Sequence, residues 1–332
     1  MPNDLSDSIS VIRGVGSYLP AEVVDNVKLS KKVDTSDEWI TSRTGIKERR
    51  IASENEATSD LACHAAQDAL LDSGFTAQDI DLIIVATITP DMAFPSTACL
   101  IQNKLGIPKV ACFDIEAACS GFLYALDIAD GMLSSKRYKC VLVVGAEKLS
   151  SIMDWEDRTT CVLFGDGAGA AIITSGGVGS QLIGFKSGAD GSNPTLLHQP
   201  AGGSLQPASH DSLTNRGHFL KMNGREIFKS AVRVMERAAR EILAEHGFSE
   251  NDVDHVIPHQ ANARIVESLS QRLKIPLGKF FCNLDKYGNT SAASIPIALD
   301  EARKASILKK GQLGLLVAFG AGLTWSAVLV RF

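Results

Sequence analysis

Two stretches of this sequence are nearly alike: GFTAQDIDLII at residues 74–84 and GFSENDVDHVI at residues 247–257. The two stretches are 173 positions apart along the chain. Further matches at the same separation are 125–127 (ALD) with 298–300 (ALD) and the apolar run 141–144 with 314–317. Three separate matches in one register indicate two copies of a single structural unit.

Each copy has the same order of predicted elements. An amphipathic helix comes first, with apolar residues at helical spacing on one face. These residues are Leu61, Ala65 and Ala69 in the first copy and Phe228, Ala231, Met235 and Ile242 in the second. A Gly-Phe stop, an Asp-rich turn and a buried strand (82–86 or 255–258) follow, and then a second helix and another strand. Strands that alternate with helices predict an α/β protein with parallel sheets covered by helices.

The boundary between the copies falls in the glycine-rich stretch 175–179, between the strand-like runs 170–174 and 182–185. We therefore expect an N-terminal half over residues 1–176 and a C-terminal half over residues 177–332. Functional sites in α/β sheets gather at the carboxyl ends of strands. The loops after matching strands in the two halves are therefore the places to search.

The composition is that of a globular protein and excludes several classes. The chain has 332 residues, of which 45% are hydrophobic and 21% charged, and a formal net charge of −5. An acidic balance argues against a general nucleic-acid binder, which needs a basic surplus. Residues 1–7 are acidic and polar, unlike a signal peptide, and no apolar run reaches the length of a membrane span. We expect a cytoplasmic protein that does not enter membranes.

The chain has seven cysteines, an odd number with no CxxC pair. This pattern predicts reduced thiols, with neither a disulfide framework nor a metal site. Buried, inert thiols are the common state of free cysteine. We expect that state for the six that lie in helix or strand patterns, namely Cys63, Cys99, Cys112, Cys140, Cys161 and Cys282.

Cys119 differs from the others by its position. It follows the strand-like run 111–115 and precedes a predicted amphipathic helix through residues 122–133. The small residues around it leave room for a substrate. A helix N-terminus favours a thiolate, through unpaired N–H groups and the helix dipole. Cys119 is therefore the candidate nucleophile, against the alternative of one more core thiol.

The second half supplies two polar residues at the matching loops. His259 follows the strand 255–258, and Asn289 lies just before a predicted helix at 295–305. Position 292 is the counterpart of Cys119 at the 173-residue separation, so Asn289 lies close to that place. Alone, each residue is more often structural, the histidine in a core and the asparagine in a turn. Together with Cys119 they form a Cys-His-Asn set.

The motifs that carry this set resemble those of β-ketoacyl-[acyl-carrier-protein] synthase III, a member of the thiolase superfamily. The motifs are AACSGF (117–122), PHQAN (258–262), YGNTS (287–291), DEWITSRTGI (37–46) and GAGLTW (320–325). The resemblance covers residues 9–332. It implies a thiolase-like five-layered αβαβα fold built from the two duplicated halves. It also implies a homodimeric acyltransferase without a cofactor, which condenses an acyl-CoA, by default acetyl-CoA, with malonyl-acyl carrier protein at the start of fatty-acid synthesis.

The same resemblance implies a role for each reacting group. Cys119 carries the acyl group as a thioester. The backbone N–H groups of Cys119 and Ala321 form an oxyanion hole. His259 and Asn289 donate hydrogen bonds to the malonyl thioester oxygen, which becomes negatively charged when carbon dioxide leaves.

Contacts to the substrates are also implied by the resemblance. The residues expected at coenzyme A are Trp39, Arg43, Thr44, Arg158 and Asn262. Phe94 is expected to cross the dimer interface and close the partner's acyl pocket. Lys229, Arg264 and Arg272 are expected to form a basic patch for the acidic carrier protein. Without the resemblance, Trp39 would be ordinary packing, Arg43 a surface ion pair and the three patch residues solvated helix faces.

Three further features bear on the substrate. The stretch GDGAGA at 165–170 looks like a dinucleotide fingerprint, but a strand pattern follows it where a helix should begin, so NAD binding is not expected. Ala321 stands where glycine is usual in the family, and the loop 189–218 is long.

Two alternatives remain open. One is a related condensing enzyme that uses longer acyl-CoAs or makes a signalling or polyketide product, and the other is a non-catalytic acyl-CoA or carrier-protein binding protein.

Overall fold

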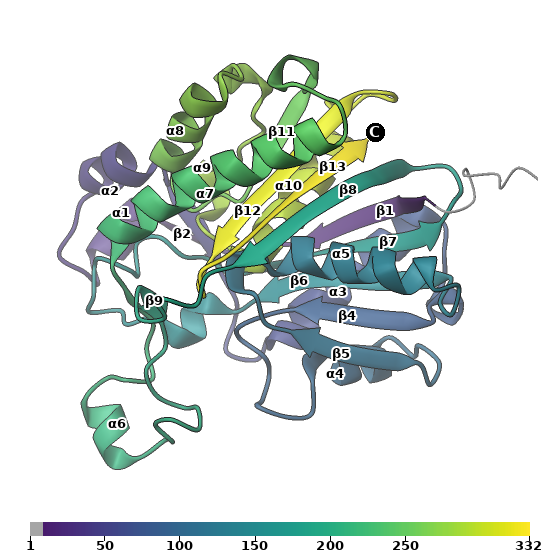
Figure 1. Cartoon of the computed structure of the whole chain (residues 1–332). Helices are drawn as coiled ribbons and strands as arrows, with labels where there is room; N and C mark the ends of the chain where they lie inside the picture. Colours follow the sequence, from purple (N-terminus) through teal and green to yellow (C-terminus); the bar gives the residue numbers. More distant parts are fainter. Residues whose placement is uncertain (1–8) are drawn as a thin grey trace, which may run out of the picture.

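The computed structural model describes residues 9–332, and its strands form one large mixed sheet with helices on both faces (Figure 1). Within residues 9–332 this sheet has nine strands, in the order β11-β12-β13-β8-β1-β7-β6-β4-β5. The strands of the first half are β1 (Ser10–Tyr18), β4 (Leu82–Ala86), β5 (Ala111–Ile115), β6 (Cys140–Glu147) and β7 (Gly167–Ser175). Those of the second half are β8 (Ser180–Ala189), β11 (His255–Pro258), β12 (Leu313–Gly320) and β13 (Thr324–Arg331).

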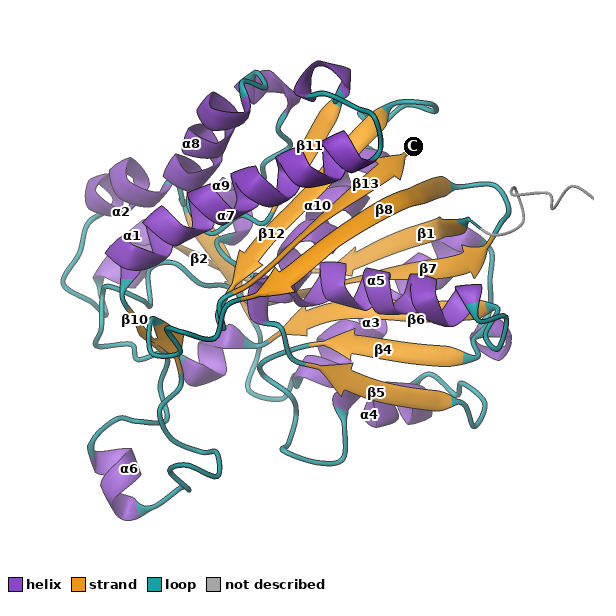
Figure 2. Ribbon diagram, in the orientation of Figure 1, coloured by secondary structure: helices purple, strands orange, loops and turns teal. Residues whose placement is uncertain are grey.

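Helices cover both faces of the sheet (Figure 2). The longer helices are α3 (Thr58–Ser73), α4 (Thr97–Lys104), α5 (Gly121–Ser134), α7 (Gly224–Glu245), α8 (Ala263–Leu273) and α10 (Ser294–Lys304). Helices α5 and α10 pack in the middle, where they share one apolar core with strands of both halves. Helix α3 covers the outer face of the first half, and α7 and α8 cover that of the second. The expected αβαβα layering is confirmed.

Each central helix reaches the other half of the chain. Asp127 of α5 accepts a hydrogen bond from Ser187 of β8 at 2.9 Å, and Asp300 of α10 accepts one from Ser17 of β1 at 2.5 Å. The two aspartates are 173 positions apart, so the contacts are counterparts in the two copies. The helix stops also match, because Gly74 and Gly247 both have a φ of 72°, which glycine adopts without a steric cost.

The expectation of purely parallel sheets is wrong. Strand β4 is parallel to β5 and β6, and β11 is parallel to β12. The remaining pairs are antiparallel, because β7 follows β6 and β13 follows β12 without a crossover helix, and antiparallel pairing needs none. Strands β1 and β8 also pair over two residue positions, which joins the two halves into one sheet.

Smaller elements surround the strand ends. They are the helices α1 (Asn26–Ser30), α2 (Asp37–Thr44), α6 (His210–Thr214) and α9 (Leu284–Tyr287) and the strand pairs β2–β3 (Glu22–Asp25 with Glu48–Ile51) and β9–β10 (Leu197–His198 with Lys221–Met222). In Figure 1, the segment with α6 projects from the body of the molecule. No helix within residues 9–332 is long and apolar enough to cross a membrane.

The expected local structure of two cysteines needs correction. Cys161 lies in a turn and Cys282 in an exposed loop before α9, so neither is part of a helix or strand.

The strand after the glycine-rich stretch is confirmed, because β7 begins at Gly167. A Cβ at Gly169 would lie 2.6 Å from Pro296, so this glycine permits close packing against α10. Gly169 therefore packs against the central layer of helices.

Candidate active site

Cys119 lies between the end of β5 and the start of α5, in a short 3-10 turn (η3, Ala118–Ser120). Its side chain is 8% exposed. The counterpart in the second half is the turn η7 (Ser291–Ala293), which precedes α10. The matched residues Ala118 and Ser291 have left-handed φ values of 46° and 49°. Both turns therefore bend in the same way at the start of the two central helices.

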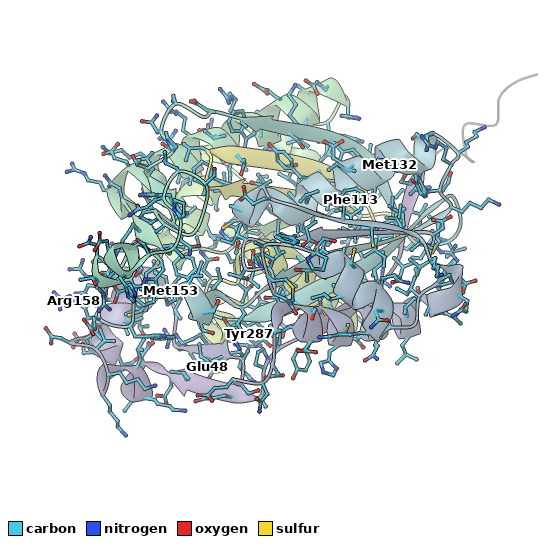
Figure 3. All side chains as sticks on the ribbon, turned by 90° about the horizontal axis from the view of Figure 1, so that it is seen from below. Glu48, Phe113, Met132, Met153, Arg158 and Tyr287 are labelled. Carbon is cyan, nitrogen blue, oxygen red and sulfur yellow. The ribbon has the colours of Figure 1, made fainter. Side chains whose placement is uncertain are left out.

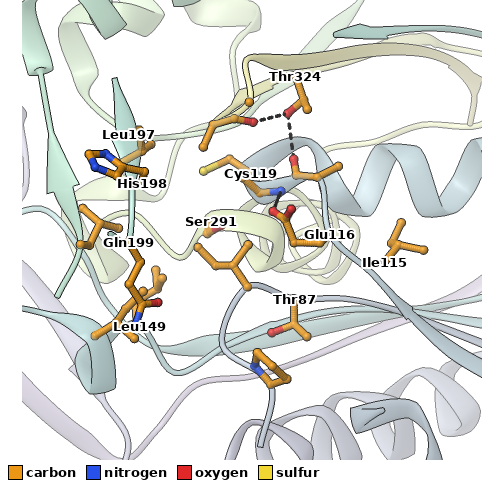
Figure 4. A pocket seen from close by; sticks show the side chains of 18 of the residues that line it. Thr87, Ile115, Glu116, Cys119, Leu149, Leu197, His198, Gln199, Ser291 and Thr324 are labelled. Carbon is orange, nitrogen blue, oxygen red and sulfur yellow. Dashed lines mark hydrogen bonds between the residues drawn. The ribbon is translucent and has the colours of Figure 1, made fainter. Parts of the chain in front are cut away.

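Two cavities meet at Cys119. The larger one, of about 620 Å³, lies among apolar side chains such as Ile88, Ile152 and Leu220 and is also lined by Ser291 and Ala321. In Figure 4, Leu197 and His198 lie across this cavity from Cys119, and Ser291 lies on the side where Thr87 is found. The narrower cavity, of about 110 Å³, is lined by His259, Asn289 and Asn262. The sulfur is thus accessible from two directions.

The structure brings the three residues of the Cys-His-Asn set to one place, because Cys119, His259 and Asn289 all line the narrower cavity. The His259 backbone N–H donates to the Val317 carbonyl at 2.7 Å, which fixes the loop after β11 beside β12. The Asn289 side-chain oxygen accepts from the Ser291 backbone N–H at 2.8 Å. The Asn289 amide nitrogen is therefore the group left to donate into the cavity.

Burial controls the protonation of this site. It lowers the pKa of His259 to about 4, so the imidazole is neutral near pH 7 and offers one N–H donor. Burial also raises the pKa of the Cys119 thiol to about 12, with a further increase from Glu147, while the Ser291 hydroxyl acts to lower it. The expectation that the helix N-terminus would favour a thiolate is wrong for this state, because desolvation outweighs the favourable backbone contribution.

The turn between β12 and β13 approaches the Cys119 backbone. The Thr324 hydroxyl donates to the carbonyls of Ala117 at 2.9 Å and Ala321 at 3.1 Å, which ties this turn to the Cys119 loop (Figure 4). Ala321 does not have a positive φ, whereas Gly322 has a φ of 131°. The left-handed geometry thus falls on a glycine, and alanine at position 321 causes no backbone strain.

The residues expected at coenzyme A lie around the narrower cavity and α2. Arg43 and Arg158 both approach the Trp39 ring, with guanidinium carbons 4.8 and 5.5 Å from its centroid. Arg158 lies at the edge of the molecule in Figure 3. Asn262 caps α8 by accepting from the Arg264 N–H at 2.9 Å and donates to the Arg43 carbonyl at 3.2 Å. Thr44 is buried and donates to the Ile40 carbonyl at 2.7 Å.

The three basic residues expected at the carrier protein are exposed on α7 and α8. Lys229 pairs with Glu226 at 2.9 Å, and Arg272 pairs with Glu236 at 3.0 Å. Arg264 instead donates to the Ser42 carbonyl at 2.9 Å, so its charge has no carboxylate partner among the ion pairs of the described residues. Among these three residues, Arg264 is therefore the one whose positive charge is not shared with a carboxylate of the described chain.

The remaining expected residues lie at the rim of the larger cavity. Phe94 is 83% exposed on the loop before α4, next to Ala93, which lines the cavity. The long loop 189–218 contributes Pro194, Leu197, His198 and Gln199 to the cavity wall. The loop therefore shapes access to Cys119.

Two other residues beside the nucleophile were not predicted from the sequence. Glu147 is fully buried at the end of β6, and Ser291 is 1% exposed in η7. Glu147 ends an apolar strand and precedes a lysine, which is the usual pattern of a strand that reaches the surface. Among the described residues, no cluster of three or more His, Cys, Asp or Glu side chains could hold a metal ion.

Comparisons with known proteins agree with the fold. Domain models described as 3-oxoacyl-[acyl-carrier-protein] synthase III and its C-terminal part match residues 113–191 and 243–332. The crystal structure of 3-oxoacyl-[acyl-carrier-protein] synthase III from Aquifex aeolicus superposes with a TM-score of 0.90 at 52% identity, covering 97% of this chain and 100% of that one. The fold and these comparisons define a thiolase-fold condensing acyltransferase.

A relative of the same description is similar over nearly the whole chain. β-Ketoacyl-[acyl-carrier-protein] synthase III of Caldanaerobacter subterraneus is 54% identical over 321 residues, which is 97% of each chain. The chain belongs to the 3-oxoacyl-[acyl-carrier-protein] synthase III family. A priming β-ketosynthase of the R1128 polyketide pathway also superposes with a TM-score of 0.90, at 35% identity over 98% of this chain and 97% of that one.

Proposed function

We propose that this enzyme condenses an acyl-CoA primer, by default acetyl-CoA, with malonyl-acyl carrier protein through an acyl thioester on Cys119. The product is a 3-oxoacyl-carrier protein, and the reaction starts fatty-acid synthesis. The observation that carries the proposal is the position of Cys119, where a wide apolar cavity meets a narrow one lined by His259 and Asn289.

In the first half-reaction the Cys119 sulfur attacks the carbonyl carbon of the acyl-CoA and expels coenzyme A. Sulfur serves as nucleophile here and as leaving group later, so the acyl group is held without loss of reactivity. The backbone N–H groups of Cys119 and Ala321 are the proposed oxyanion hole, and one such donor contributes about 10²–10³ in rate. The acyl chain would occupy the larger cavity.

In the second half-reaction malonyl-carrier protein loses carbon dioxide, and the resulting enolate attacks the acyl group on Cys119. Decarboxylation itself makes the carbanion, so the site needs to stabilise negative charge on the thioester oxygen. A neutral His259 and the Asn289 amide nitrogen are suited to donate two hydrogen bonds to that oxygen.

Both acyl substrates would enter past α2 and α8. We propose that Trp39, Arg43 and Arg158 bind coenzyme A, with Thr44 and Asn262 beside them. The two guanidinium groups at the Trp39 ring support an aromatic and anionic ligand such as a nucleotide. Lys229, Arg264 and Arg272 are the proposed contacts of the acidic carrier protein.

We also propose a cytoplasmic homodimer whose chain divides into halves at residues 176 and 177. Strand β5 is the last strand of the sheet and pairs only with β4 among the described strands, so its other edge is available to a second copy. Phe94 and Met92 near this edge are 83% and 47% exposed. Exposed apolar side chains beside an open strand edge support an interface in which Phe94 reaches the partner's cavity.

A related condensing reaction with a longer primer is the second candidate. The cavity of about 620 Å³ at Cys119 exceeds the needs of an acetyl group. A structural relative at 35% identity is a priming synthase of a polyketide pathway. Labelling of Cys119 with acyl-CoAs of increasing chain length would distinguish the two candidates, because acetyl transfer should be fastest for the first.

Mass spectrometry of the intact protein tests the main proposal. Acetyl-CoA should add one acetyl group to the enzyme, and Cys119→Ala should abolish the mass increase. His259→Ala and Asn289→Ala should still be acetylated but should not condense the acyl group with malonyl-carrier protein. Loss of acetylation in both variants would contradict the separate roles, and an unlabelled parent enzyme would refute the Cys119 thioester.

A further inference from the structure

One buried carboxyl group beside the nucleophile has no part in the mechanism above. Glu147 is 0% exposed at the carboxyl end of β6. None of the ion pairs formed by the described residues includes it. A carboxylate buried without a cation is costly, so its position next to Cys119 requires an explanation.

The residues after β4 hold this carboxyl group in place. The hydroxyl groups of Thr89 and Thr87 donate to it at 2.6 and 3.2 Å, and the Ile88 backbone N–H donates at 3.2 Å. The Lys148 N–H in turn donates to the Thr89 hydroxyl at 2.9 Å, and the Thr89 N–H donates to the Thr87 hydroxyl at 3.1 Å. These fixed N–H donors orient both hydroxyl protons toward Glu147, as an ionised carboxylate requires.

Ser291 connects this group to the nucleophile. Its hydroxyl is buried and has no hydrogen-bond partner among the described residues in this conformation. The turn η7 that carries it packs against both the Cys119 turn η3 and strand β6, which ends at Glu147. The hydroxyl acts to lower the pKa of both groups. The backbone of Ser291 is fixed by its N–H, which donates to the Asn289 side chain at 2.8 Å. In Figure 4, Ser291 lies between Cys119 and the part of the cavity where Thr87 is found.

The charges explain why the two groups should act together. A thiolate beside an ionised Glu147 would place two anions in one buried site. Movement of the thiol proton to the carboxylate keeps a single negative charge there. We propose that Glu147 accepts the Cys119 thiol proton, through the Ser291 hydroxyl, as the sulfur attacks the acyl-CoA. This inference rests on the proposed nucleophilic role of Cys119.

The protons balance over both half-reactions. The thiol proton passes to the Ser291 oxygen while the Ser291 proton passes to Glu147, and the sulfur–carbon bond forms. The bond to the coenzyme A sulfur then breaks, and that thiolate takes a proton from water. In the second half-reaction the enolate displaces the Cys119 sulfur, which recovers its proton from Glu147 by the reverse route. One solvent proton is consumed per turnover, which balances the loss of the malonyl carboxylate as carbon dioxide.

The surroundings allow Glu147 to change its charge near pH 7. Burial raises its pKa to about 7, although all its hydrogen-bond partners act to lower it. Asp114 and Glu116 face the cavity from β5 and its loop, where they accept backbone N–H groups. The Lys148 ammonium group turns away to the carbonyls of Ser53 and Glu56. Glu147 in turn raises the pKa of the Cys119 thiol, so the charges of these two groups depend on each other.

Rapid-quench acetylation of Cys119 by acetyl-CoA, followed by mass spectrometry between pH 5.5 and 9.5, tests the proposal. For the parent enzyme the rate should rise with pH and level off above about 7. Glu147→Gln should lower the rate at pH 7 by about 10²-fold or more, and its rate should keep rising into the alkaline range. A Glu147→Gln enzyme that is acetylated as fast as the parent, or faster, would overturn the proposal, since that result is expected if Glu147 only repels the thiolate.

Two more variants keep the test decisive. Ser291→Ala keeps Glu147 and introduces the residue that already has this backbone conformation at Ala118, so it should fold and show the same loss. A fully active Ser291→Ala would exclude the relay. Asp166→Asn is the matched control, because Asp166 is also a fully buried carboxyl, bound by Ala52 and Ser150. Equal loss in Asp166→Asn would overturn the specific role of Glu147, whereas an unlabelled parent would instead refute the Cys119 thioester.

Discussion

Gly320 lies so close to Cys119 that a Cβ at position 320 would be 2.8 Å from the Cys119 backbone nitrogen. The same atom would be 3.0 Å from the Thr324 hydroxyl and 3.1 Å from the Ala117 carbonyl. Two backbone segments that are distant in sequence therefore meet beside the nucleophile. The absence of a side chain at position 320 leaves the Cys119 N–H accessible to an oxyanion.

Gly320→Ala should therefore reduce acylation more than it reduces folding. The added methyl group meets backbone atoms that cannot move independently, so we expect a loss of about 1–3 kcal/mol in stability. Displacement of one oxyanion donor should slow acetylation of Cys119 by about 10²-fold. Urea unfolding and the rate of acetyl transfer would measure the two effects. Gly278→Ala is the control, because a Cβ there meets no atom of the described residues within 4 Å. Normal acetylation by Gly320→Ala would contradict the assignment.

The depressed pKa of His259 predicts a specific pH dependence. Its folded-state pKa of about 4 lies below the ordinary value of 6.5, so the unfolded chain binds the proton more tightly. Stability should therefore fall as the pH drops from 6.5 to 4, by up to about 3 kcal/mol from this group. Unfolding of the parent and of His259→Gln over this range would measure the difference. A parallel decrease in both proteins would show that His259 is not the source.

The sequence predicted the architecture well because its two copies keep one register. The matched positions Gly74 and Gly247 stop their helices with the same φ, and the turns at Ala118 and Ser291 also match. The strand directions were not predictable from the same pattern. The connection lengths carry part of this information: only residues 321–323 join β12 to β13, which is too short for the crossover that a parallel pair needs. Residues 148–166 between β6 and β7 are enough for either direction.

The Cys-His-Asn set was predictable because each member lies in a distinctive loop motif. Glu147 was not, since its role depends on hydrogen bonds to residues about sixty positions earlier, such as Thr87 and Thr89. Such contacts form only when β4 and β6 lie side by side in the sheet. The protonation of Cys119 was mispredicted for a similar reason, because the burial that raises its pKa arises only in the folded chain and outweighs the local backbone contribution.

The two arginines at Trp39 predict a change in coenzyme A affinity. Arg158→Ala should raise the KM for acetyl-CoA by about tenfold, because a guanidinium group near an aromatic ring and an anionic ligand is lost. The rate constant at saturation should stay the same, since Arg158 lines neither of the two cavities at Cys119. Arg237→Ala is the matched control, because Arg237 lies on α7 with its guanidinium carbon 5.0 Å from the centroid of the Trp325 ring. An unchanged KM in Arg158→Ala would exclude this residue from the site.

The unpaired charge of Arg264 predicts which residue of the basic patch matters most. Arg264→Glu should raise the KM for malonyl-carrier protein by about tenfold at low salt, with a smaller effect at high salt. Lys229→Glu should have less effect, because Lys229 already shares its charge with Glu226. Arg137→Glu, in the exposed turn after α5, is the control for total charge. Equal effects of all three substitutions would indicate net charge and no defined docking patch.

Glu147 should make the fold less stable at the pH where it assists catalysis. Its folded-state pKa of about 7 lies above the ordinary value of 4.5, so the folded protein binds this proton more tightly than the unfolded chain does. The stability that goes with the bound proton is complete below pH 4.5 and is lost as the pH rises through 7, by up to about 3 kcal/mol. Glu147→Gln should therefore be more stable than the parent at pH 8 and similar at pH 4.5, as measured by urea unfolding. A variant that is less stable at both pH values would show that the hydrogen bonds to the carboxylate outweigh the cost of its burial. A variant that is more stable but slowly acetylated would mean that the enzyme retains a destabilising group for its chemistry.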